Sequence, residues 1–122
     1  MRYSALLFTM FALLLGGCAR TPFGVMDAKL DAMKGQPIKT ATDALGDPSE
    51  IVDVGDEKSY RWSLTAGLGG AYSALAFRCD IAIFADKGGN ISHYAYNGNN
   101  AGCSRYAIKL DSEYHFAKGI LD

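Results

Sequence analysis

The three cysteines are the residues whose chemistry says most about this chain, and Cys18 has the most specific surroundings. It directly follows Leu15-Gly16-Gly17, which closes an apolar run that begins at Ala5. Arg2 supplies the positive start of a secretion signal, and the glycines let a protease approach the backbone. The 13 residues from Ala5 to Gly17 would reach only about 20 Å as a helix, against roughly 30 Å of hydrocarbon. We therefore predict a cleaved signal peptide over residues 1–17.

This arrangement resembles the lipobox of bacterial lipoproteins, whose cysteine becomes the acylated N-terminus of the mature protein. The resemblance implies a lipoprotein signal peptide, a lipid on Cys18 and attachment to a membrane through that lipid. Residues 19–25 contain Pro22 and Gly24 and have no periodic pattern, so we expect residues 18–25 to form a lipid-anchored tether. Ala19 after the cysteine fits sorting to the outer membrane by the same resemblance. The alternative is an ordinary signal peptide followed by an incidental cysteine.

Cys79 and Cys103 are the remaining pair, and an even pair in an exported chain favours a disulfide. The bridge would close a loop of about 25 residues and contribute roughly 3 kcal/mol in the chain-entropy model. If the strands on either side of residues 86–90 pair with each other, the bridge closes across the end of the sheet. A metal or redox pair is the alternative, but the CxxC spacing that favours it is absent.

Few other residues have the types and spacing that catalysis needs. His93 and His115 are the only histidines, and neither stands in a nucleophile-elbow context. Two carboxylate pairs are candidates for acid–base work, but on a short helix and in a hairpin turn we expect solvated charges: Asp27 with Asp31, and Asp56 with Glu57. We therefore expect no enzyme, no metal site and no cofactor.

Length and charge restrict the remaining possibilities. Cleavage before Cys18 leaves residues 18–122, a chain of 105 residues (122 minus 17), which has room for a single domain over residues 26–122. The 12 Lys and Arg residues balance 13 Asp and Glu residues and form no basic stripe, so nucleic acid is not an expected partner. The glycine-rich loop around Gly67, Gly69 and Gly70 lacks the Lys-Ser/Thr step of a phosphate-binding loop.

Two short helices are predicted at the start of the domain. The first covers residues 26–33 and ends at Gly35, while the second begins with Pro37 at its first position and ends before Gly46. Their apolar residues recur at helical spacing: Met26, Leu30 and Met33 in the first, and Ile38, Ala41 and Leu45 in the second.

After Pro48 the apolar pattern alternates, which predicts antiparallel strands over residues 50–54, 58–65, 76–85 and 91–96. Hairpin turns are expected at Gly55-Asp56 and at 86–90. In the second strand Tyr60, Trp62 and Leu64 form the buried side. The turn-forming residue types at 97–102 predict a loop. Further on, the alternation of Tyr106, Ile108 and Leu110 favours a last strand, whereas 113–121 has a helical pattern.

Tyr94 and Tyr96 share one side of a predicted strand, opposite Ile91 and His93. One side of the sheet must pack on the helices, which leaves the other for solvent or a partner. Exposed tyrosines make good contact residues because they are large and lose little conformational entropy. The alternative is that they cover a sheet edge or the C-terminal tail.

The order of these signals resembles the SmpA/OmlA family of small bacterial outer-membrane lipoproteins. The resemblance covers about residues 26–103 and is carried by short motifs: Gly35-Gln36-Pro37-Ile38, Leu45-Gly46-Asp47-Pro48, Tyr60-Arg61-Trp62, Cys79, Asp86-Lys87-Gly88-Gly89-Asn90-Ile91, Gly98 and Cys103. It implies an α+β fold, with two short N-terminal helices packed on a three- or four-stranded antiparallel sheet. It also implies a scaffolding role without catalysis.

The leading hypothesis is a lipid-anchored protein-interaction module that faces the periplasm from the outer membrane. It would contact an envelope protein and act as an accessory or scaffolding factor in outer-membrane assembly or maintenance. The candidate partner surface combines Tyr94 and Tyr96 with Gly67, Gly69 and Gly70. The alternative is an envelope-anchored inhibitor of a lysozyme-like hydrolase, with the loop at 97–102 filling the enzyme's cleft.

Overall fold

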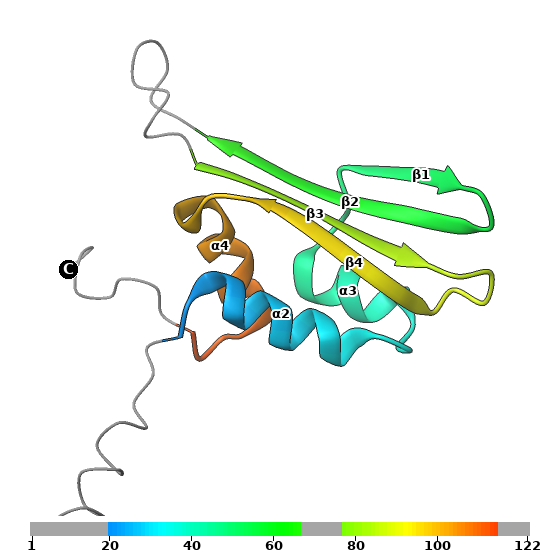
Figure 1. Ribbon diagram of the computed structural model, residues 1–122, viewed down its shortest axis with the longest axis horizontal. Helices are drawn as coiled ribbons and strands as arrows, with labels where there is room; N and C mark the ends of the chain where they lie inside the picture. The colour runs from blue at the N-terminus through cyan, green and yellow to red at the C-terminus, as the bar shows by residue number, and fades with distance from the viewer. Residues whose placement is uncertain (1–19, 67–76, 115–122) are drawn as a thin grey trace, which may run out of the picture.

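A four-stranded antiparallel sheet forms one layer of the molecule, and three helices lie on one side of it (Figure 1). The computed structural model describes residues 20–66 and 77–114. The sheet order follows the chain: β1 (Glu50–Val54), β2 (Glu57–Ala66), β3 (Phe77–Ala85) and β4 (Ile91–Gly98). The helices are α2 (Pro22–Met33), α3 (Ile38–Leu45) and α4 (Asn100–Leu110). The predicted α+β class, with four antiparallel strands and one disulfide, is confirmed.

The alternation along the strands determines which side of the sheet receives the helices. Cross-strand pairing aligns Trp62 with Ile81, and Ile81 with Tyr96, so these side chains point to one side. Trp62 and Ile81 are buried there with Met26 and Leu30 of α2, which forms the core. The indole of Trp62 also donates a 2.9 Å hydrogen bond to the carbonyl of Gly46, which attaches β2 to the end of α3.

Helix α2 begins four residues before the predicted start. The Thr21 side chain accepts a 3.0 Å hydrogen bond from the backbone N–H of Gly24 and so caps the helix. Pro22 fits the first turn because its missing N–H would have no partner there. Val25 is buried against the core. Residues 22–25, which we assigned to the tether, therefore belong to the folded domain.

Helix α4 is the largest difference from the prediction. The side chain of Asn99 accepts a 2.8 Å hydrogen bond from the N–H of Gly102 and starts the helix. Residues 97–102 therefore form the end of β4 and the first turn of α4, and the predicted loop is wrong. The predicted strand over residues 106–110 is also wrong. Tyr106 and Leu110 are four apart and pack on the core, while Ile108 is exposed, which is helical periodicity.

The segment between α2 and α3 closes one end of the β4 edge. Gly35 donates its N–H to the carbonyl of Ile91, and Ile91 donates to the carbonyl of Gln36, both at 2.8 Å. Pro37, predicted as the first residue of the second helix, precedes it as the N-cap and forms a bridge with Asn90. The β1 edge, by contrast, has no paired segment within residues 20–66 and 77–114.

Candidate functional site

The site residues predicted from the sequence fall into three groups. Cys18 lies outside the described residues, and so do the three glycines of the predicted partner surface, Gly67, Gly69 and Gly70. Cys79 and Cys103 are joined in the predicted disulfide, with their Cα atoms 5.0 Å apart. Tyr94 and Tyr96 lie together on β4, on the side that faces the helices.

The disulfide joins β3 to α4 and does not close across the end of the sheet as expected. Cys79 pairs in the sheet with Gly98, and Cys103 lies in the first turn of the helix. The helix approaches the strand so closely that a side chain at Gly102 would place its Cβ 2.4 Å from the backbone N and O of Arg78. A Cβ at Gly98 would come within 2.9 Å of the Cys103 sulfur. Both glycines are therefore required by the close approach.

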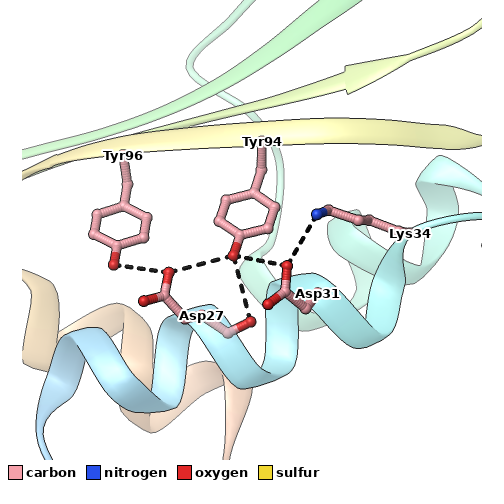
Figure 2. A network of polar contacts seen from close by, with 5 residues as sticks. All are labelled: Asp27, Asp31, Lys34, Tyr94 and Tyr96. Carbon is pink, nitrogen blue, oxygen red and sulfur yellow. Dashed lines mark hydrogen bonds and ion pairs between the residues drawn. The ribbon is translucent and has the colours of Figure 1, made fainter.

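Tyr94 and Tyr96 bind two carboxylates of α2, as Figure 2 shows. The Tyr96 hydroxyl donates to Asp27 Oδ1 at 2.9 Å. The Tyr94 hydroxyl lies 3.0 Å from Asp31 Oδ1 and 3.3 Å from Asp27 Oδ1, and its single proton is best placed for Asp31. Lys34 donates to the same Asp31 oxygen at 3.0 Å and lies 5.2 Å above the ring of Tyr94. The network joins the helix layer to the sheet.

This network holds the tyrosines in their neutral form. Burial, followed by the hydrogen bond to Asp27, raises the pKa of Tyr96 to about 12. Burial and the hydrogen bond to Asp31 raise the pKa of Tyr94 further. The hydrogen bond from Lys34, followed by that from Tyr94, lowers the pKa of Asp31. The raised pKa values of the tyrosines favour their protonated, hydrogen-bond-donating form, and the lowered pKa of Asp31 favours its ionised, accepting form.

The two tyrosines therefore differ from our expectation of a free contact surface. They are half-buried between β4 and α2, and their hydroxyls already have partners inside the domain. The ring of Tyr96 also stacks on Phe23 of α2, with centroids 5.7 Å apart. The side chains pack against α2, whereas the alternative expected from the sequence was a sheet edge or the C-terminal tail.

The other side of the sheet faces away from all three helices (Figure 1). Cross-strand pairing places successive rows of residues on it. We call this surface the uncovered face; its central rows are Val52, Ser59, Phe84 and His93; Glu50, Arg61, Ala82 and Ala95; and Ser63, Asp80 and Asn97. A shallow depression of about 400 Å³ lies over Ala82 and Ala95, because these short side chains stand between longer ones. Arg61, Asp80 and Asn97 supply polar groups around it.

A serine, a histidine and a carboxylate meet at one end of the uncovered face. Ser92 Oγ lies 2.9 Å from His93 Nδ1 and also donates to a carboxylate oxygen of Glu57. That carboxylate lies 3.5 Å from the same imidazole nitrogen. A hydrolytic triad needs the acid on one ring nitrogen and the serine on the other, so this geometry does not supply one. His93 instead stacks on Phe84, with centroids 4.2 Å apart.

Sequence reasoning missed the depression, because its residues lie on four strands. Each strand has an ordinary polar alternation, and only the register brings Ala82 opposite Ala95. The signal available in the sequence was a pair of alanines on the polar sides of two strands that were predicted to form a hairpin.

The described residues contain neither a cluster of metal ligands nor a membrane-spanning helix. Among residues 20–66 and 77–114, no three His, Cys, Asp or Glu side chains are grouped so that they could hold a metal ion. Within the same residues, every helix is too short or too polar to cross a membrane. Comparison of the chain with protein-family models, with curated proteins and with solved structures finds no match.

Proposed function

We propose that this protein is a lipid-anchored interaction module of the bacterial cell envelope. In this proposal Cys18 carries the lipid, the folded domain faces the periplasm from the outer membrane, and the uncovered face contacts an envelope protein. The role is that of an accessory or scaffolding factor, without chemistry of its own.

The observation that carries the proposal is a sheet side on which no helix of residues 20–66 and 77–114 lies, hollowed where Ala82 faces Ala95. A sheet of four strands needs one covered side for its core, and the three helices that the structure describes all lie on that side. The secretion signal and Leu15-Gly16-Gly17-Cys18 support the anchor, and the disulfide is consistent with an oxidising compartment.

The experiment is in-cell cross-linking of the full-length protein followed by mass spectrometry, with Cys18→Ser as the anchor control. We expect outer-membrane or barrel-assembly components to be enriched, and to be lost when the lipid cannot be attached. Absence of any envelope partner from the wild-type sample would contradict the proposal.

A pair of matched variants tests the uncovered face. Ala95→Arg places a long charged side chain in the depression, whereas Ala28→Arg adds the same side chain at an exposed position of α2. Filling the depression should reduce partner capture about tenfold or more, because losing one hot-spot contact costs about 2 kcal/mol or more and each ~1.4 kcal/mol is a factor of ten in Kd. Equal capture by both variants would remove the uncovered face from the proposal.

The structure lacks the protruding loop at residues 97–102 on which the lysozyme-inhibitor hypothesis was based. These residues are the end of a strand and the start of a helix, with Gly102 buried. We do not propose this inhibitor function.

A further inference from the structure

The edge strand β1 is the place where exposed apolar side chains and free strand hydrogen-bonding groups coincide. Three large hydrophobic side chains are exposed in the described residues, and two of them are in this five-residue strand: Ile51 at 55% and Val54 at 48%. The third is Ile108 of α4, at 44%. Because strand neighbours point to opposite sides, Ile51 and Val54 lie on different sides of the sheet.

The outer edge of β1 is open in the part of the chain that the structure describes. Its register joins it to β2 alone, whereas the start of β4 is closed by the segment Gly35–Pro37. Edge strands in soluble proteins are commonly protected by charged side chains, proline or a bulge; β1 has no lysine, proline or bulge, and its protection consists of the carboxylates of Glu50 and Asp53. An edge of this kind accepts an added strand, whose main chain continues the ladder.

The charges of this segment are all negative. Residues 46–57 contain five carboxylates and no lysine, arginine or histidine, although the whole chain has a net charge of only −1. The carboxylates are Asp47, Glu50, Asp53, Asp56 and Glu57. Arg61 and Lys87 reach two of them from neighbouring strands and turns, at 3.8 Å and 3.5 Å, but these pairs are exposed and therefore weak.

This charge pattern decides between the candidate occupants of the edge. In a pairing of β1 with β1 of a second copy, no register places a base opposite Glu50 or Asp53, because the segment contains none. Each carboxylate would instead face an uncharged side chain or another carboxylate. A strand that carries bases at the matching positions gains an ion pair at both.

We propose that β1 is the docking edge for an extended segment of the partner that carries two basic residues three positions apart, with β-branched residues between them. The bases would stand opposite Glu50 and Asp53, and the apolar residues opposite Ile51 and Val52. This inference rests on the proposed interaction role and names the chemistry of the partner.

The test uses the full-length protein in detergent and three short capped peptides. The first has the sequence Val-Lys-Val-Val-Lys, with its lysines three positions apart. The second has glutamate in place of lysine, and the third is the lysine peptide with N-methylated backbone amides. Hydrogen–deuterium exchange is measured over residues 50–54. We expect the lysine peptide alone to slow exchange there by several-fold, because only it offers both the bases and the backbone donors.

Matched variants locate the binding. Ile51→Lys should abolish the slowing, while Ile108→Lys, at the exposed apolar position of α4, should leave it unchanged. Glu50→Gln combined with Asp53→Asn should weaken peptide binding by about three- to tenfold, the effect of two exposed ion pairs.

Several results would overturn the inference. These are exchange that is unchanged by the lysine peptide, equal slowing by the glutamate peptide, slowing confined to another element, or slowing that grows with protein concentration without any peptide. The last result would assign the edge to a second copy. If the wild type captures an envelope partner in cells but the peptide test is negative, only the docking role of β1 is refuted. The proposed function then still holds.

Discussion

The hydrogen bond from Tyr96 to Asp27 belongs to the network that joins β4 to α2, and it can be tested by removing a single oxygen atom. Tyr96→Phe removes the hydroxyl and should lower the free energy of unfolding by about 1 kcal/mol, the usual net value of such a bond. Tyr60 is the matched control, since it is half-buried on the same side of the sheet and its hydroxyl makes no hydrogen bond within the described residues. Urea unfolding of both variants gives the comparison, and an equal loss would refute a specific role for the bond.

The same network predicts a loss of stability at high pH. The pKa of Tyr96 is about 10 in the unfolded chain and about 12 in the folded domain. A raised folded pKa means that the stabilisation is complete below pH 10 and is lost as the pH rises toward 12. The free energy of unfolding should therefore fall more steeply above pH 10 in the wild type than in Tyr94→Phe/Tyr96→Phe. Parallel curves would contradict this.

At the scale of elements, the disulfide is the covalent link between α4 and the sheet. Cys79 and Cys103 are 24 residues apart, so replacing both with alanine should lower the free energy of unfolding by roughly 3 kcal/mol. The effect should be largest in α4, whose amides would exchange with solvent faster while those of β2 change less. Uniform acceleration across both elements would show that the bond acts on the whole fold instead.

Most elements of the fold could be predicted because their local signals agree. The alternation of Tyr60, Trp62 and Leu64 predicted a buried strand side, and Gly55 and Gly89 have the positive φ that their hairpin turns need. The sequence misled at α4, where turn-forming residues at 97–102 concealed a helix cap at Asn99. There the close approach to Arg78 and the bond to Cys79 decide the conformation, and neither is local in sequence.

The candidate surfaces were harder to predict than the elements. Tyr94 and Tyr96 were identified as a pair, but only the position of α2 decides whether they meet a partner or Asp27 and Asp31. The depression at Ala82 and Ala95 depends on register across two strands. The acidic character of residues 46–57, in contrast, is visible in the sequence and needed only the sheet order to place it on an edge.

At the scale of the whole molecule, the early start of α2 would limit the distance between the domain and the membrane if Cys18 is acylated as proposed. Only residues 19–21 separate Cys18 from Pro22, a link that reaches about 14 Å when fully extended. The start of α2 and strand β1 lie toward opposite ends of the described structure (Figure 1). With Cys18 acylated as proposed, a short linker would keep the domain in a thin layer beside the bilayer. The rate at which the domain meets partners in the same membrane would then depend on its local concentration in that layer, and a longer linker would lower this concentration.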